Sequence, residues 1–266
     1  MSNIQLTNDQ KVLATAKIMK YRVVPPDIET FVNDDYYLGK IFGTKLPNGL
    51  FQYWMDVLKE IYPTPIICRY PYVSLGGAIG TGKSTTTKIM TLYNLCKLWS
   101  LIDPWDSFGI SRVKAMAFTF VHMSSQLSYR EFGQSLETIM EQSPYFKNPP
   151  VTHDIRFQYE GVRNSASLGT DTVFYSLSEI NFYPRDVGKQ KLDTAMGRYT
   201  SRFQKFKNYI GNIVFDCSAR GDSSTMSAFL ADNALGNSLL SISASQWEVK
   251  GSERGEIGRA SCRERV

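Results

Sequence analysis

A glycine-rich run at residues 77–84, Gly-Ala-Ile-Gly-Thr-Gly-Lys-Ser, constrains the fold more than any other part of this 266-residue sequence. It fits the pattern G-x-x-x-x-G-K-[ST] at every fixed position. A β-like segment at 72–75 precedes it, and a long helix is predicted over 83–99. Glycines allow the backbone to curl so that successive N–H groups point at phosphate oxygens, and the helix N-terminus adds partial positive charge. The run therefore predicts a nucleotide-binding phosphate loop, or P-loop.

Each position of this loop has an expected role, with ATP and Mg²⁺ as the ligands. The backbone is expected to surround the phosphates at Gly77, Ala78, Ile79, Gly80, Thr81 and Gly82, and Thr85 completes the loop. Lys83 is expected to contact the β- and γ-phosphates, and the hydroxyl of Ser84 to bind Mg²⁺.

Predicted strands and helices alternate along the rest of the chain. The expected strands lie at about 113–121, 172–177 and 210–215, with a hairpin at 154–166; the expected helices lie at 7–20, 50–61, 128–142, 186–206 and 226–234. Such alternation predicts an α/β protein whose mostly parallel central sheet is covered on both faces. We expect a three-layer P-loop NTPase fold of the RecA-like (ASCE) type. The predicted division is a helical extension at 1–60, an ATPase core at 61–250 and a disordered tail at 251–266.

Composition excludes several other classes of protein. No apolar run reaches 18 residues, so no membrane span is expected, and the N-terminus lacks a secretory signal pattern. The four cysteines show no paired spacing, which argues against a zinc ribbon or a disulfide framework. We interpret His122 and His153 as structural or surface residues. The net charge of +5 is compatible with an anionic partner without proving one.

Glu179 is the candidate catalytic base, because it follows the apolar segment 172–177 at the end where α/β sheets place their ligands. Its carboxylate would polarise the attacking water. The aspartate usual just before such a glutamate is replaced by Ser178, which would bind Mg²⁺ weakly, through a water. Asp171 and Asp216 are possible substitutes, although nothing in the sequence places either beside the metal.

A further apolar segment at 210–215 ends in small polar residues. In motor ATPases a hydroxyl at this point can sense the γ-phosphate, and Ser218 is the candidate. Arg220 is a weaker candidate for contacts with phosphate or DNA.

Several segments together make the sequence resemble the large terminase subunit of tailed phages. They are Asp27-Ile-Glu-Thr-Phe with Asp35-Tyr-Tyr-Leu-Gly39, the P-loop with Leu92-Tyr-Asn-Leu95, Glu141-Gln-Ser-Pro-Tyr-Phe146, Ser178-Glu-Ile-Asn-Phe182 and Cys217-Ser-Ala-Arg220. The resemblance covers about 27–247.

The resemblance implies an ATP-driven motor that moves double-stranded DNA into procapsids in the host cytoplasm. Its implied partners are the portal protein, the small terminase subunit and further copies of itself in a ring, and it implies no membrane. The nuclease domain usual in the family is not expected within this chain. Residues 256–266 resemble a translated sequencing adapter, so the natural sequence is expected to end near Gly255.

Other family features are met only in part. Family P-loops often carry an arginine where this chain has Ala78, so the source of an arginine finger stays open among Arg156, Arg163, Arg198 and Arg202. Gln52, beside two aromatic residues, matches the glutamine that commonly binds adenine upstream of the P-loop.

Basic residues along the predicted helix at 186–207 could neutralise DNA phosphates: Lys189, Lys191, Arg198, Arg202, Lys205 and Lys207. Three other interpretations stay open. The chain could be a helicase-like ATPase, a small-molecule kinase, or an ATP-binding fragment with little turnover.

Overall fold

The computed structural model describes residues 7–163, 169–203, 210–218 and 236–251. Four features of the sequence analysis lie outside these ranges: the predicted helix at 226–234, Arg220, the pair Lys205 and Lys207, and the tail from residue 252.

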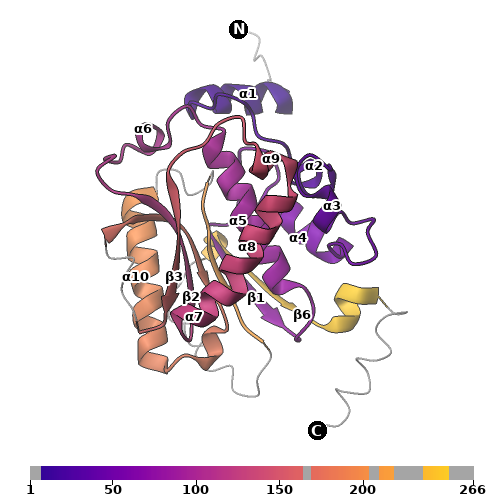
Figure 1. Cartoon of the computed structure of the whole chain (residues 1–266), viewed down its shortest axis with the longest axis vertical. Coiled ribbons are helices and arrows are strands. Elements are labelled where there is room, and N and C mark those ends of the chain that lie inside the picture. Colours follow the sequence, from indigo (N-terminus) through magenta and orange to yellow (C-terminus); the bar gives the residue numbers. More distant parts are fainter. Residues whose placement is uncertain (1–6, 164–168, 204–209, 219–235, 252–266) are drawn as a thin grey trace.

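Helices and strands alternate through most of the described chain (Figure 1). In chain order the elements are α1 (Asn8–Ile18), α2 (Ile28–Asn33), α3 (Gly39–Phe42), α4 (Gln52–Ile61), β1 (Tyr72–Gly77), α5 (Lys83–Trp99), α6 (Pro104–Phe108), β2 (Met116–His122), α7 (Ser125–Ser128), the π-helical turn η1 (Tyr129–Gly133), α8 (Gln134–Gln142), α9 (Pro144–Lys147), β3 (Ile155–Gly161), β4 (Asp171–Leu177), the 3₁₀ turn η3 (Ile180–Phe182), α10 (Arg185–Phe203), β5 (Ile213–Asp216), the 3₁₀ turn η5 (Gly236–Ser238) and β6 (Leu239–Ala244).

The six strands form one sheet in the order β3-β2-β4-β5-β1-β6, and every neighbouring pair is parallel. The strands therefore all end at the same side, which we call the carboxyl edge. Strand β5 lies between β4 and β1, so the segment before Glu179 and the P-loop strand are separated by one strand. The predicted α/β fold with a parallel central sheet is confirmed.

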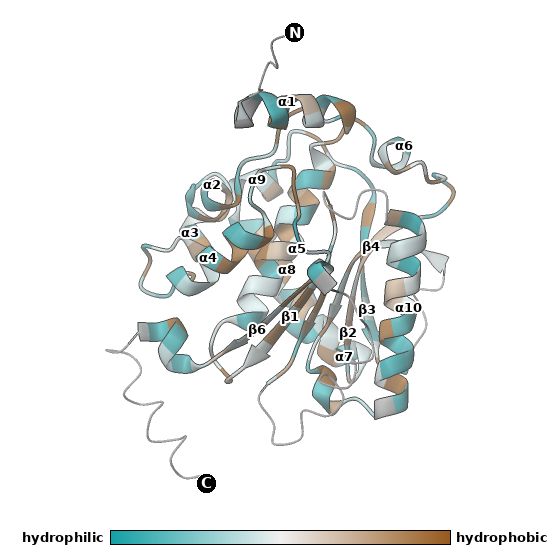
Figure 2. Cartoon of the chain, turned by 180° about the vertical axis from the view of Figure 1, so that it is seen from behind, coloured by the Kyte–Doolittle hydropathy of each residue, from teal (hydrophilic) through white to brown (hydrophobic). Residues whose placement is uncertain are grey.

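Helices cover the sheet on both faces, as seen by comparing the opposite views of Figures 1 and 2. Helix α5 contacts β4 and β5, while α10 contacts β4. All seven residues of β4 are buried, including apolar Val173 and Phe174. Burial on both faces explains why this strand is a nearly continuous apolar run in the sequence rather than an alternating one.

The hairpin predicted at 154–166 is wrong. Residues 155–161 form the single strand β3, which pairs in parallel with β2 at the edge of the sheet. Gly161 does not mark a turn; a Cβ there would approach the backbone of Ser124 and Ser125 at 3.2 Å, so the glycine permits close packing of α7. The alternating pattern arises because an edge strand is only partly covered.

Three further features of the fold differ from the sequence prediction. Strand β2 begins at Met116 rather than near Val113, which is exposed. The helix predicted at 128–142 is interrupted by the π-helical turn η1. Strand β6 was not predicted, because this edge strand is short and only half-buried.

Helices α1 and α4 form where the sequence predicted helices, at 7–20 and 50–61. Thr7 and Gln10 make a reciprocal capping box that starts α1, and the Asp27 side chain caps α2 by accepting from the Thr30 N–H. Helices α2 and α4 both pack against α5, and the division at residue 60 stays a prediction. Within the described ranges, no helix is long and apolar enough to cross a membrane.

Helix α5 is buried along most of its length and is anchored by polar contacts in the core. The Asn94 amide donates to the hydroxyl of Tyr62 and to Oδ1 of Asn212, each at 2.9 Å, and its oxygen accepts from the Gly211 N–H at 2.8 Å. One turn further on, the ammonium group of Lys97 donates to the Ile66 carbonyl at 2.8 Å. These bonds fix the depth of α5 over the sheet.

Lys97 should make stability depend on pH. Its burial lowers its pKa to about 8, so the folded state releases a proton that the unfolded state keeps until about 10.5. The cost of burying the charge is fully present below pH 8 and is relieved as pH rises toward 10.5. We expect Lys97→Met to be more stable relative to wild type at pH 7.5 than at pH 9.5, by about 2 kcal/mol. Urea unfolding at both pH values measures this difference, and a constant difference would contradict it. Lys40→Met, at an exposed lysine, is the control.

Candidate functional site

The P-loop leaves β1 at Gly77 and turns sharply into α5. Gly77 has φ 122°, and a Cβ at this position would lie 2.0 Å from the carbonyl oxygen of Ala244 on β6. The next N–H, of Ala78, donates to that same carbonyl at 3.1 Å. Gly80 and Gly82 also have positive φ. Only glycine adopts this sequence of conformations without strain, which explains the spacing found in the sequence.

Two side chains outside the motif hold the loop. The indole N–H of Trp54 on α4 donates to the Thr81 carbonyl. The side-chain amide of Gln246, which follows β6, donates to the Ile79 carbonyl at 2.9 Å. The loop is thus positioned by partners that the motif itself does not reveal.

Lys83 lies at the first position of α5 with its side chain folded onto the loop. Its ammonium group donates to the carbonyls of Gly77 at 3.1 Å and Ala78 at 2.7 Å. Burial lowers the pKa of Lys83, while the negative charges of Asp216 and Glu179 raise it. Lys83 therefore has both carboxylates within its electrostatic reach. Ser84 and Thr85 follow on the same turn and are partly buried.

Glu179 follows β4 in the left-handed conformation, with φ 55°. This conformation is uncommon for a residue other than glycine, and such strain concentrates at functional sites. Both carboxylate oxygens are bound by Ser218: Oε1 accepts from the hydroxyl at 2.6 Å and Oε2 from the backbone N–H at 3.1 Å. The structure thus brings together the predicted base and the predicted sensor.

Asp216 ends β5 directly beside this pair. Its Oδ1 accepts from the Glu179 N–H at 3.1 Å, and it is also hydrogen-bonded to the side chain of buried Ser178. Burial raises the pKa of Asp216 to about 7, and the two hydrogen bonds act in the opposite direction. The other proposed substitute, Asp171, lies at the opposite end of β4, where it pairs with Arg202 at 3.4 Å. Of the two, only Asp216 belongs to the site.

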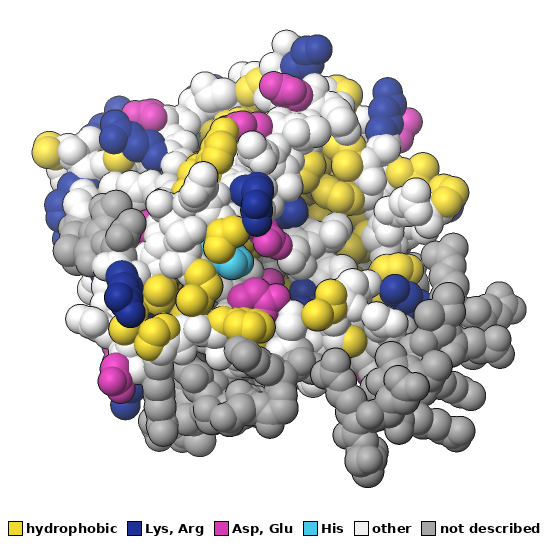
Figure 3. All heavy atoms as spheres, turned by 60° about the horizontal axis from the view of Figure 1, so that its bottom comes forward, with side chains coloured by type: hydrophobic (Ala, Val, Ile, Leu, Met, Phe, Trp, Pro, Cys, Tyr) yellow, Lys and Arg dark blue, Asp and Glu magenta, His cyan; other side chains and the backbone are white. Residues whose placement is uncertain are grey.

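His122, at the end of β2, borders the same edge. Burial lowers its pKa, and the charges of Glu131 and Glu179 offset only part of that lowering. No sequence pattern indicated this position, because it depends on β2 lying next to β4 in the sheet. Figure 3, which views this side, shows acidic side chains gathered beside a histidine. His153 instead packs near Trp105, and its ring Nε2 lies 3.0 Å from the Leu101 carbonyl.

Gln52 opens α4, two residues before the tryptophan that contacts the P-loop. Its amide is exposed and donates to Asp56 at 2.8 Å. The assignment of Gln52 to adenine stays a prediction.

The arginine candidates are divided between the two ends of the strands, the carboxyl edge and the side where the strands begin. Arg156 lies near the start of β3, and Arg198 and Arg202 lie toward the end of α10, whose last turn approaches the start of β4. Arg163 follows β3 and is the candidate on the carboxyl side.

The donors at the carboxyl edge suit Mg²⁺ bound together with a nucleotide. Within the described ranges, no three His, Cys, Asp or Glu residues are arranged to hold a metal by themselves. Mg²⁺ in nucleotide sites is usually held by phosphates, water and one or two protein carboxylates or hydroxyls. Ser84 offers the hydroxyl, and Asp216 offers a buried carboxylate. The residues present therefore fit the metal.

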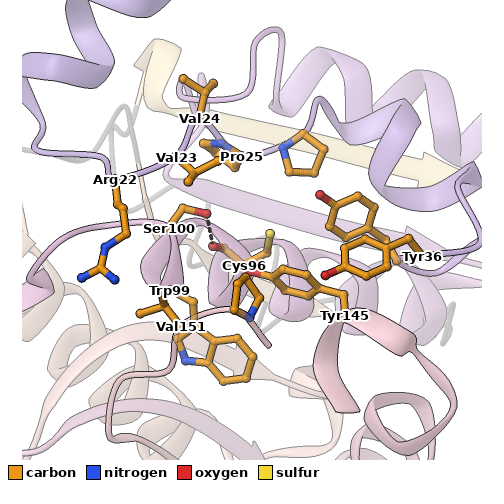
Figure 4. A pocket seen from close by; sticks show the side chains of 13 residues that line it. Arg22, Val23, Val24, Pro25, Tyr36, Cys96, Trp99, Ser100, Tyr145 and Val151 are labelled. Carbon is orange, nitrogen blue, oxygen red and sulfur yellow. Dashed lines mark hydrogen bonds between the residues drawn. The ribbon is translucent and has the colours of Figure 1, made fainter. Parts of the chain in front are cut away.

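A separate cavity of about 350 Å³ lies at the far end of α5 (Figure 4). Cys96, which lines it, is 13 residues beyond Lys83, or about 20 Å along the helix. Here the aromatic segments at 35–39 and 141–146 meet: Tyr145 packs on Tyr36 and Tyr37, and its N–H donates to the Tyr36 carbonyl at 2.9 Å. Two segments of the sequence resemblance thus pack together away from the P-loop.

The glycine at position 77 can be tested against its neighbour at position 80. Gly77→Ala should destabilise the fold by roughly 3 kcal/mol, because the methyl group meets the Ala244 carbonyl and φ is positive. Gly80→Ala has a positive φ but open space around it, so about 1–2 kcal/mol is expected. Urea unfolding of both variants measures the difference. Equal losses would show that the contact with β6 does not constrain the loop.

Comparison with known proteins shows where else this fold occurs. No protein-family description matches the sequence, and no curated protein matches it. Among solved structures, the large terminase of bacteriophage HK97 is similar over 81% of this chain and 42% of its own, with 13% identity and a TM-score of 0.53. The large terminase of a thermophilic bacteriophage, in complex with ATP-γ-S, is similar over 80% of this chain and 49% of its own, with 11% identity and a TM-score of 0.52.

A third structure corresponds to the ATPase domain alone. This mutant domain of the Thermus phage P74-26 large terminase is similar over 81% of this chain and 88% of its own, with 10% identity and a TM-score of 0.50. The chain spans about half or less of the two longer proteins and most of the isolated domain. It therefore has the fold of the ATPase domains of phage large terminases.

Proposed function

We propose that this chain is the ATP-hydrolysing motor domain of a phage large terminase, which drives double-stranded DNA into procapsids. The observation that carries the proposal is that Lys83, after β1, and Glu179, after β4, both lie at the carboxyl edge with one strand between them, and that both oxygens of Glu179 are held by Ser218. A phosphate cradle beside a positioned carboxylate suits transfer of a phosphoryl group to water. The shared fold supports the terminase assignment.

Hydrolysis would use the chain's residues as follows. The backbone N–H groups of the loop bind the phosphates, except that of Ala78, which already donates to the Ala244 carbonyl, and Lys83 exchanges its two carbonyl partners for phosphate oxygens. Glu179 accepts a proton from the attacking water. Ser84, with a nearby carboxylate, would hold Mg²⁺, which when bound neutralises phosphate charge.

Ser218 would couple the state of the nucleotide to the base. In this structure its hydroxyl and N–H hold Glu179 bidentately, so the base is oriented by the end of the next strand, β5. A γ-phosphate arriving at the P-loop would compete for the same hydroxyl. The ends of β4 and β5, which carry Glu179 and Ser218, would thereby respond together to the bound nucleotide.

The partners follow from the proposed function. They are double-stranded DNA, a portal protein, a small terminase subunit and further copies of the chain in a ring, in the host cytoplasm and transiently at the procapsid portal. Helix α10 is the candidate DNA surface, although part of its basic face serves the fold. Lys191 pairs with buried Glu160 at 2.7 Å, and Arg202 pairs with Asp171.

A nucleotide-binding fragment with little turnover is the second candidate. Two observations favour it: Ser178 replaces the usual acidic residue, and both oxygens of Glu179 are occupied in this structure. A helicase-like ATPase remains an alternative that shares the P-loop.

Steady-state ATP hydrolysis with and without double-stranded DNA tests the proposal. Glu179→Gln should lower turnover by about 10²–10⁴-fold while ATP still binds, because the side chain keeps its size but cannot take the proton. Lys83→Ala should abolish turnover and weaken ATP binding. DNA should stimulate the wild type, which a metabolite kinase would not show.

The control for this experiment is Glu141→Gln, which changes an exposed carboxylate on α8 and should behave as the wild type. Tight ATP binding without turnover in the wild type would favour the nucleotide-binding fragment. Turnover that survives Glu179→Gln would exclude Glu179 as the base.

Ser218→Ala should lower turnover by about 10- to 100-fold, because a hydrogen bond to a charged group contributes ~1.5–3 kcal/mol. ATP affinity should change much less than turnover, since Ser218 contacts Glu179 rather than the P-loop. Ser218→Thr keeps the hydroxyl and should recover most of the activity. Equal losses in the Ala and Thr variants would indicate a packing effect instead.

A further inference from the structure

Resting on the proposed function, we propose that Asp216 supplies the carboxylate for the nucleotide-bound Mg²⁺ that the residue before the catalytic glutamate normally supplies. The acidic position has in effect moved from the end of β4 to the end of β5. Ser178 then acts by orienting Asp216 rather than as a metal ligand.

The sheet register places the two positions side by side. Leu177 of β4 pairs with Phe215 of β5, so Ser178 and Asp216 are the next residues along the two strands. The hydrogen bond between their side chains agrees with this placement. A carboxylate at position 216 therefore occupies nearly the same part of the edge as one at position 178 would.

Along the sheet, Asp216 is also nearer to the P-loop than Ser178 is. Strand β5 is the direct neighbour of β1, and Asp216 pairs with Leu75, two residues before the loop begins. Its charge is the largest electrostatic influence on Lys83 after burial. The carboxylate thus lies between the catalytic glutamate and the lysine that binds phosphate.

Asp216 is buried without a direct ion pair to any cation of the described residues. It is only 4% exposed. A buried carboxylate without a cationic partner is costly. Its two hydrogen bonds, from Ser178 and the Glu179 N–H, orient the group without neutralising it. A divalent cation is the partner that such a group lacks, whereas a neutral serine hydroxyl is a poorer ligand for Mg²⁺.

The test is a Mn²⁺ titration of the full chain with bound ATP-γ-S, followed by electron paramagnetic resonance of free Mn²⁺. Asp216→Asn keeps the size of the side chain and an oxygen for the Glu179 N–H, but removes the charge. We expect it to weaken Mn²⁺ binding by about 10- to 100-fold. Affinity for ATP-γ-S in excess EDTA should not weaken, because the P-loop is intact.

Exchanging the two positions makes the test specific. Ser178→Asp combined with Asp216→Asn restores one carboxylate and should recover much of the Mn²⁺ affinity. Ser178→Ala alone should weaken it less than Asp216→Asn does. Asp171→Asn, which removes an equally buried carboxylate at the other end of β4, is the matched control and should not change it.

Two results would overturn the inference: unchanged Mn²⁺ affinity in Asp216→Asn, or a greater loss in Ser178→Ala. Failure of the proposed function would look different: the wild type would then show no ATP turnover, or would not bind ATP-γ-S even in EDTA, whatever its affinity for Mn²⁺.

Discussion

The burial of α5 against the sheet is the constraint on which the site depends. Asn94 joins this helix to Tyr62 and to the start of β5, and Lys97 joins it to the segment that follows α4. Unsatisfied polar groups in such a core are costly, so these partners fix both the depth and the register of the helix. The N-terminus of α5, and with it the P-loop, is then held at the carboxyl edge of the sheet.

The order of the strands decides which side chains lie beside the P-loop. Because β5 lies between β1 and β4, the residues that end it lie between the strand that leads into the P-loop and Glu179. Ser218 and Asp216 contact Glu179 from alternate positions: one binds its carboxylate and the other its N–H. The left-handed backbone of Glu179 is therefore held by two contacts from a single neighbouring segment.

Sequence patterns predicted the parts of this arrangement that are local. The glycine spacing indicated the P-loop, and the apolar runs before Glu179 and Asp216 indicated β4 and β5. Such patterns do not contain the order of strands, so the placement of Asp216 and His122 beside Glu179 remained open. The half-exposed edge strands were the least predictable: β3 alternates as one arm of a hairpin would, and β6 carries no clear pattern although its Ala244 carbonyl shapes the start of the loop.

A serine at position 178 is compatible with a working site for a related physical reason. Parallel strands in register present equivalent positions about 5 Å apart, so a charge moved from one strand to the next stays close to where it was. Two carboxylates at 178 and 216 would repel each other in a buried setting, and each would raise the pKa of the other. The edge therefore holds one acid at one of the two positions, and the neutral neighbour serves it best as a hydrogen-bond donor. A serine beside a buried aspartate fits that division of roles.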